Sequence, residues 1–280
     1  MKLPSYSSTV QSMIDAHEEE RQEEPRTHLG ASLIGHKCER LIWLTFRWAV
    51  REKLPGRMLR LFQRGHDEEK KMVHWLQNIG CVFRENVSRI DFDGHVSGTP
   101  DGIIESGVPT AEKTPHLFEC KTANEKSFND LEKKGVKLSK PQHYMQMQVY
   151  MLGANLDRAL YAVTCKNDDR LYFERVKLDK MWANAMIAKG QQIAVSQTMP
   201  PPLSASPTWY ECKMCAAYAF CHQGVAVTER NCRTCASSRP DARGQWYCIG
   251  EKDKELMTAK EQVDGCSYHR MRKDLEHFHA

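Results

Sequence analysis

Hydrophobic positions recur at helical spacing in two segments of the first third of the chain. Leu, Ile, Trp and Phe follow one another at intervals of three and four over residues 29–48, where Ser32 is of a type that caps helices. This pattern predicts a packed helix whose N-terminal end holds Cys38. A second helix is predicted for residues 58–79, because Gly80 supplies a typical helix end.

The period then changes to the alternation that is typical of β-strands. Residues 81–90 alternate, residues 91–94 (DFDG) have the composition of a turn, and residues 95–105 read as the returning strand. Together they predict a hairpin. Residues 117–122 (LFECKT) predict a short third strand.

Helical and strand patterns alternate in the next segment. Residues 141–152 predict a helix with proline in its first turn, and residues 159–165 and 170–177 predict two strands around a polar turn. A last helix is predicted over residues 179–196. The order α, β, β, β, α, β, β, α indicates an α/β protein with a sheet flanked by helices.

The two ends of the chain differ from this middle region. Residues 1–28 form a strongly charged arm, which we expect to be a solvated helix or a mobile segment. Residues 200–202 (PPP) read as a stiff linker into a cysteine-rich tail. We therefore expect an arm, a central domain over residues 29–223 and a small module over residues 224–280.

Composition narrows the class of protein. The 280 residues are 41% hydrophobic and 27% charged, with a formal charge of +4 and a pI near 8.4. These values exclude a wholly disordered chain. No run of residues reaches the roughly 20 apolar positions of a membrane helix, and the N-terminus lacks the apolar stretch of a signal peptide. We expect a cytoplasmic protein with no membrane association.

Three polar residues within the predicted strands suggest catalytic chemistry. Glu119 and Lys121 are two positions apart in a strand and therefore project from one face, whereas Cys120 points to the other. Asp101 follows Pro100 in the preceding strand. Two carboxylates of this kind can hold Mg²⁺ or Mn²⁺, and the lysine can orient or deprotonate an attacking water molecule.

The arrangement Gly98-Thr99-Pro100-Asp101 followed by Glu119-Cys120-Lys121 resembles the signature of the PD-(D/E)xK nucleases. The resemblance places Asp101, Glu119 and Lys121 on the three defining catalytic positions, with both carboxylates as metal ligands. It implies a restriction-endonuclease-like core, in which a central mixed β-sheet is flanked by helices.

Two further motifs resemble those of RecB-type nucleases in the expected order. Residues 64–69 (RGHDEE) match a helical motif that implies His66 as an additional metal ligand and Glu69 as a supporting group. Residues 142–150 (QHYMQMQVY) match the glutamine-containing helix, which implies a positioning role for Gln146 with Tyr150 one turn later. Structural roles for His66 and Glu69, and a solvent-facing Gln146, are the alternatives.

Seven of the eleven cysteines fall within residues 212–266, which favours metal ligation over disulfides in a reducing compartment. One cysteine before the predicted core and three after it resemble the [4Fe-4S] site of iron-sulfur RecB-type nucleases such as AddB and the nucleases of CRISPR adaptation. The implied ligands are Cys38, Cys212, Cys215 and Cys221. An ordinary buried Cys38 beside a zinc-bound trio is the alternative.

The last four cysteines predict a separate zinc site. Cys232, Cys235, Cys248 and Cys266 begin with a C-x₂-C pair and supply four thiolates to a segment with few apolar residues. His269 is an alternative to Cys266 as the fourth ligand. We expect this segment to fold independently around zinc. The remaining Cys81, Cys120 and Cys165 are expected to be small buried hydrophobic residues.

Together these features predict a Mg²⁺- or Mn²⁺-dependent deoxyribonuclease, by resemblance an exonuclease in DNA recombination, repair or phage replication. DNA is the expected partner, and a single-strand annealing or single-strand-binding protein is a further expected partner. The alternatives are a catalytically silent DNA-binding or scaffold protein of the same fold, and an RNA nuclease.

Overall fold

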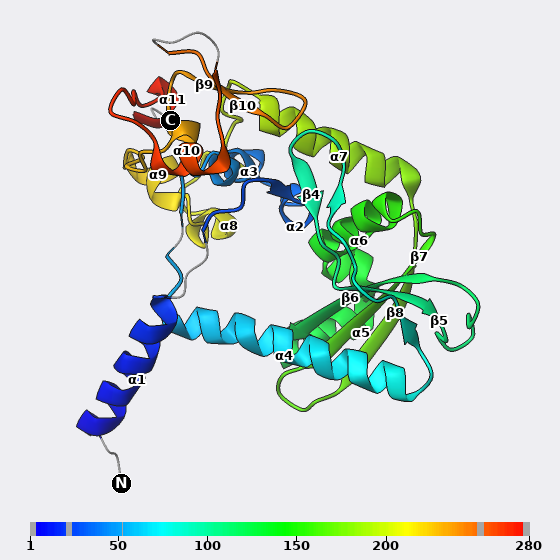
Figure 1. Ribbon diagram of the computed structural model, residues 1–280. Coiled ribbons are helices and arrows are strands. Elements are labelled where there is room, and N and C mark those ends of the chain that lie inside the picture. Colours follow the sequence, from blue (N-terminus) through cyan, green and yellow to red (C-terminus); the bar gives the residue numbers. More distant parts are fainter. Residues whose placement is uncertain (1–3, 21–23, 52, 251–254, 277–280) are drawn as a thin grey trace.

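The computed structural model describes residues 4–20, 24–51, 53–250 and 255–276 (Figure 1). Its centre is a five-stranded sheet with the strand order β2-β5-β6-β7-β8. β6 and β7 are parallel and the other neighbours are antiparallel, so the sheet is mixed, as predicted. The strands are β2 (Val82–Phe83), β5 (Gly102–Ser106), β6 (His116–Ala123), β7 (Arg158–Cys165) and β8 (Leu171–Lys177).

Helices cover both faces of this sheet. On one face, Met72 and Leu76 of α4 (Gly56–Asn78) pack in a cluster with Phe118 and Cys120 of β6. On the other face, α6 (Pro141–Gly153) packs against β6 and β7. α7 (Lys180–Val195) packs on α6. β6 is therefore covered on both sides, which explains why Leu117, Phe118, Cys120 and Ala123 accompany the two charged residues on its α6 face.

The predicted helix over residues 29–48 is divided into three elements. Leu29–Gly30 form β1, which is followed by α2 (Ala31–Ile34) and, after a break at Gly35, by α3 (Glu39–Phe46). Gly30, and not Ser32, occupies the N-cap of α2. The single-helix prediction was wrong because β1 pairs in parallel with β4 (Val96–Gly98), a contact that local spacing does not reveal.

The predicted hairpin over residues 81–105 is split between two sheets. β3 (Ile90–Asp91) and β4 pair around a turn in which Asp93 and Gly94 have positive φ, and they join β1 in a small three-stranded sheet. β2 and β5 belong to the central sheet instead. Pro100 separates β4 from β5, since proline cannot donate a ladder hydrogen bond.

The longest helix without a counterpart in the predictions lies between β6 and α6. α5 (Glu125–Ser139) precedes α6 and begins at Asn124, whose side chain accepts a hydrogen bond from Ser127 N. Its lysine-rich composition hides the pattern, because only Phe128, Leu131 and Val136 are buried. The helix is kinked at Gly135, where φ is +71° and ψ is 170°.

At the N-terminus, α1 (Pro4–Glu19) packs against α4. Glu19 Oε1 accepts a hydrogen bond of 2.8 Å from Gly56 N, and Asp15 forms an ion pair with Arg60. Residues 4–19 of the predicted charged arm are therefore helical. No helix in the described ranges is long and apolar enough to cross a membrane.

The cysteine-rich tail shares the core of the central domain. Trp246, Val227 and Leu275 belong to the same hydrophobic cluster as Trp43 and Phe46 of α3. This shared cluster joins the tail to α3, and independent folding of residues 224–280 stays a prediction. The tail contains α8 (Tyr210–Lys213), α9 (Tyr218–Gln223), the 3₁₀ turn Cys232–Thr234, β9 (Ser238–Pro240), β10 (Trp246–Cys248), β11 (Glu255–Leu256), α10 (Ala259–Asp264) and α11 (Lys273–Glu276).

Candidate active site

β6 places Glu119 and Lys121 on the α6 face of the central sheet, as strand alternation requires. Cys120, between them, points to the opposite face and packs in the cluster beneath α4. Cys81 and Cys165 are also buried, at 4% and 0% exposure, in agreement with the prediction.

Asp101 reaches the same point from the neighbouring strand. It directly precedes β5, which pairs with β6 so that Gly102 lies opposite Phe118. Asp101 Oδ2 accepts a hydrogen bond of 2.8 Å from Cys120 N and lies 3.3 Å from Lys121 Nζ. The sheet therefore brings the three predicted catalytic residues together.

Three oxygen atoms converge on the Lys121 ammonium group. Lys121 Nζ forms an ion pair with Glu119 Oε1, contacts Asp101 Oδ2 and donates to Cys120 O at 3.0 Å. The Glu119 side chain is completely buried, and its Oε2 has no hydrogen-bond partner among the described residues. A buried carboxylate oxygen without a donor suits a cation ligand.

The charges in this cluster shift one another's pKa. Burial raises the pKa of Glu119 to about 8, against the opposing effect of Lys121. Burial lowers the pKa of Lys121, but the charges of Glu119 and Asp101 outweigh it and raise that pKa well above its usual value. Strongly shifted carboxylate and amine groups of this kind concentrate at functional sites.

α6 presents polar side chains toward these carboxylates at successive turns. Burial, together with the charges of Glu119 and Asp101, raises the pKa of Tyr150 to about 12, so the phenol lies within their electrostatic reach. Tyr150 also packs directly against Gly98, where any β-carbon would collide with its hydroxyl group. Gln146, one turn earlier on α6, is 7% exposed.

His143 and Tyr161 also adjoin the site, and sequence reasoning missed both. Tyr161 lies opposite Glu119 in the parallel register of β6 and β7, and its hydroxyl group is 2.7 Å from His143 Nδ1. Burial lowers the pKa of His143 to about 4, and Lys121 contributes to the shift. The available signal was helical spacing, because residues 143, 146 and 150 follow one another by three and four.

The two predicted residues of α4 differ in their surroundings. Burial, together with the charge of Asp101, raises the pKa of Glu69, while His66 and Lys121 oppose the shift. Glu69 therefore lies beside the catalytic cluster. His66 is exposed on the same helix.

Within the described part of the chain, no group of three or more His, Cys, Asp or Glu side chains is arranged so that it could hold a metal ion. The oxygen donors that do converge are two carboxylates, from Asp101 and Glu119, and one backbone carbonyl, from Cys120. Hard oxygen donors of this type fit Mg²⁺ or Mn²⁺. Since Mg²⁺ retains several water molecules, this small donor set is chemically suitable.

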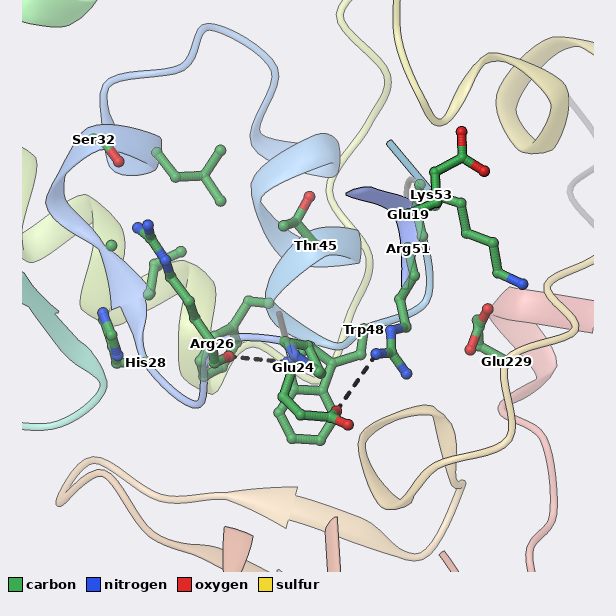
Figure 2. Close-up of a pocket in the computed structure, with 16 residues that line it drawn as sticks. Glu19, Glu24, Arg26, His28, Ser32, Thr45, Trp48, Arg51, Lys53 and Glu229 are labelled. Atoms are coloured by element: carbon green, nitrogen blue, oxygen red, sulfur yellow. Dashed lines mark hydrogen bonds and ion pairs between the residues drawn. The ribbon is translucent and has the colours of Figure 1, made fainter. Parts of the chain in front are cut away.

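A separate cavity of about 930 Å³ has no residue of this site in its lining (Figure 2). It is bounded by the segment around Arg26 and by α3, and its lining mixes Arg26, Arg51 and Lys53 with acidic residues. Trp48 Nε1 donates to Arg26 O at 3.0 Å at its edge. Arg26 has a weak opposing effect on the raised pKa of Tyr150.

The first set of four cysteines is brought together although Cys38 is 174 positions from Cys212. Burial raises the pKa of Cys212, with a further contribution from Cys38. Burial also raises the pKa of Cys221, with contributions from Cys38 and Cys215. Hydrogen bonds reach two of the sulfurs, from Leu41 N to Cys38 at 3.4 Å and from Arg40 Nη1 to Cys221 at 3.9 Å.

In the second set, Cys232 lies within electrostatic reach of the other three cysteines. Burial raises the pKa of Cys232 to about 11, and Cys266, Cys235 and Cys248 each add to the shift. Ser237 N donates to Cys235 Sγ at 3.5 Å. All eleven cysteines lie in the described ranges, and none of them forms a disulfide. His269 makes a different contact, with its Nε2 3.1 Å from Thr234 Oγ1.

Comparison with known proteins gives likenesses of structure only. No protein-family model matches the chain, and no curated protein matches it. Among solved structures, the protein SSO0001 is 15% identical with a TM-score of 0.47, over 76% of this chain and 96% of that protein. An alkaline exonuclease from Laribacter hongkongensis, LHK-Exo, is 18% identical with a TM-score of 0.42, over 65% of this chain and 90% of LHK-Exo.

A phage-related exonuclease from Haemophilus somnus 129PT is 15% identical with a TM-score of 0.35, over 47% of this chain and 70% of that protein. At these identities and TM-scores, the likeness assigns no activity to this chain.

Proposed function

We propose that this chain is a divalent-metal-dependent deoxyribonuclease that removes nucleotides from DNA ends. The observation that carries the proposal is the convergence of Glu119, Asp101 and Cys120 O on Lys121 Nζ at the centre of the mixed sheet. A structural ion pair has no need of a second carboxylate or of a buried oxygen without a donor. Phosphodiester hydrolysis needs both a cation site and an adjacent base or charge-neutralising group.

Each residue has a distinct role in this proposal. Asp101 and Glu119 would hold Mg²⁺ or Mn²⁺, which when bound polarises the scissile phosphate and lowers the pKa of water. Lys121 orients the attacking water and offsets charge that develops on the phosphate oxygens. Gln146 and Tyr150 position the strand or water from α6, Glu69 supports the carboxylates from α4, and His66 is a further candidate ligand.

A cleavage assay tests the proposal. Anaerobically purified protein is incubated with linear DNA labelled at either end and with circular DNA, with and without Mg²⁺ or Mn²⁺. We expect metal-dependent shortening of the linear DNA from its ends and no cutting of the circle. Asp101→Ala and Glu119→Ala should each abolish the activity while leaving the circular-dichroism spectrum unchanged.

The other functions give different results in the same assay. Cutting of circular DNA would show an endonuclease, and cutting of RNA alone would show an RNA nuclease. Binding of DNA without cutting under all metal conditions would indicate a silent DNA-binding protein and would contradict the proposal. Full activity in either carboxylate variant would refute the assigned site.

We also propose that Cys38, Cys212, Cys215 and Cys221 hold a [4Fe-4S] cluster. Four thiols gathered from both ends of the central domain, two of them accepting hydrogen bonds, form a suitable donor set. The cluster would link α3 to the start of the tail and stabilise the fold. Cys38→Ser should remove the visible absorption and the bound iron, whereas Cys165→Ser, in a buried strand, should retain both.

For the tail, we propose a zinc site formed by Cys232, Cys235, Cys248 and Cys266. The proximity of Cys266 to Cys232 and the contact of His269 with Thr234 favour the four-cysteine set. Cys266→Ser should lower the zinc content, and His269→Ala should leave it unchanged. The reverse result would make His269 the fourth ligand.

A further inference from the structure

The two edges of the central sheet differ in length. β2 forms one edge with two residues, whereas β8 forms the other with seven. A long edge strand presents a row of backbone N–H and C=O groups to any second strand, and proteins usually shorten or cover such edges. Among the described residues, no further strand lies beside β8. β8 is therefore the edge at which this sheet can be extended.

The backbone of β8 points alternately toward β7 and toward the open edge. Cys165 N donates to Arg170 O at 2.9 Å, and Leu178 N donates to Asp157 O at 2.9 Å. Both bonds involve even-numbered residues on the β8 side, so the antiparallel ladder directs the even-numbered residues toward β7. The odd-numbered residues within 171–175 therefore direct their N–H and C=O groups toward the edge.

The side chains at this edge include exposed apolar groups. Leu171 and Phe173 are 42% and 44% exposed. Both project from the face of the sheet that carries α4, where Phe173 lines a groove of about 290 Å³ with Ile79 of α4. α4 itself packs on β6, two strands away. The edge thus offers apolar surface in addition to backbone groups, and burial of that surface would stabilise a complex by roughly 25 cal/mol per Å².

A second copy of this chain fits the edge in one register. Two identical antiparallel strands related by a two-fold axis place one outward-directed residue opposite its own copy. Arg175 at the axis would set two guanidinium groups against each other, whereas Phe173 brings two rings together. With Phe173 at the axis, Leu171 lies opposite Arg175 of the second copy. Asp169, just before β8, then lies opposite Lys177 of the second copy, so opposite charges meet at both ends.

We propose that two copies of this chain associate through β8, with the two-fold axis at Phe173. The odd-numbered residues of the two strands exchange backbone hydrogen bonds and join the two five-stranded sheets into one continuous sheet. Since this axis is perpendicular to the sheet, the two clusters of Asp101, Glu119 and Lys121 lie on the same side of the dimer. Such a dimer is independent of the proposed nuclease activity.

Sedimentation velocity of the full-length protein over a wide range of concentrations tests the proposal. The wild type should dimerise. Phe173→Glu removes the apposed rings and sets two carboxylates opposite each other, so the dimer dissociation constant should rise at least about 100-fold. Met13→Glu, which changes a 68% exposed side chain of α1, is the matched control and should leave the dissociation constant unchanged. Melting curves should show that both variants fold, because both side chains are exposed.

An exchange of charges tests the register. Asp169→Lys and Lys177→Asp should each raise the dissociation constant about five-fold, because each sets like charges opposite one another at both ends of the paired strands. The double variant restores opposite charges and should recover the wild-type value. A double variant that dimerises more weakly than both single variants would overturn the register.

Two results would overturn the dimer itself. A wild type that is monomeric at every concentration would show that β8 does not pair with its own copy, and would leave the edge to a strand of another protein. Phe173→Glu with wild-type dimer affinity would place the contact between copies on another surface.

Discussion

Lys121 and Glu119 project from the same face of β6, and their ion pair lies where the Glu119 carboxylate is wholly inaccessible to solvent. Asp101 approaches the same ammonium group from the start of β5. The carboxylates of Asp101 and Glu119 would repel each other, and the Lys121 ammonium group between them offsets this repulsion. Lys121 therefore has a structural role in addition to its proposed catalytic role.

Lys121→Ala should lower turnover by at least about 100-fold, since it removes the group that orients water and neutralises charge. The melting temperature of the metal-free variant should also fall, because Glu119 loses the one counter-ion that it contacts among the described residues. Added Mg²⁺ should restore part of this stability. Turnover and melting curves measure the two effects.

The matched control is Lys126→Ala, which removes an exposed lysine in the first turn of α5. It should change neither turnover nor the melting temperature. Wild-type turnover in Lys121→Ala would contradict the catalytic role.

Gly98→Ala should displace Tyr150, because a β-carbon at this position collides with the phenol. We expect a loss of activity together with a loss of roughly 1–3 kcal/mol in unfolding free energy, as for other overpacked sites. Gly65→Ala is the control for stability, since Gly65 lies in α4 with open space around it and alanine favours the helix. If Gly98→Ala kept full stability and activity, the close contact between Gly98 and Tyr150 would be needed for neither.

The burial of His95 leads us to expect that the protein is less stable in acid. It is 4% exposed, it stacks edge-on against Phe46 and Trp246, and burial lowers its pKa to about 4. Because the folded-state pKa lies below the unfolded value of 6.5, its contribution is full above pH 6.5 and is lost as pH falls toward 4. The loss should amount to about 3 kcal/mol.

Denaturant unfolding between pH 7 and pH 4 measures this dependence. His95→Gln cannot titrate, so its stability should fall less steeply with pH than that of the wild type, although the variant starts lower at pH 7. Identical slopes for the two proteins would show that other groups cause the acid sensitivity.

Short-range patterns predicted that Glu119 and Lys121 share one face of a strand, and their catalytic role stays a prediction. Alternation alone placed Glu119 and Lys121 on one face, because a strand has a period of two in any context. The parallel pairing of Tyr161 with Glu119 is long-range, so the sequence around Tyr161 contains no sign of it. His143 was missed although its helical spacing from Gln146 and Tyr150 is visible in the sequence.

The errors in the fold also come from long-range contacts. The helical spacing over residues 29–48 is real, but pairing of Leu29–Gly30 with β4 removes the first residues from the helix. α5 was missed because its lysines dominate its composition while only three side chains face the core. In the tail, Trp246 packs against α3, and this long-range contact is not visible in the local sequence.

Arg233 joins the tail to α3 as a buried cation that pairs with no carboxylate of the described residues. The guanidinium is 1% exposed and lies 3.8 Å from the ring centroid of Trp48. It donates to Phe46 O, Thr27 O and Gln262 Oε1 at 2.8, 2.6 and 2.9 Å. Burial lowers its pKa to about 9, so the group remains charged at neutral pH.

Arg233→Met should therefore destabilise the whole protein by at least about 3 kcal/mol, because it leaves buried acceptors without donors and removes the cation–π contacts. Arg243→Ala, the substitution of an exposed arginine in the same tail, should have almost no effect on stability.

A chain truncated after Gly224 should lose still more stability, since Phe46 of α3 and the nearby Trp48 would become exposed. Near-ultraviolet circular dichroism and denaturant unfolding measure these losses. If the truncated chain melted cooperatively near the wild-type temperature, the tail would be a separate module after all, and the shared core would contribute little to stability.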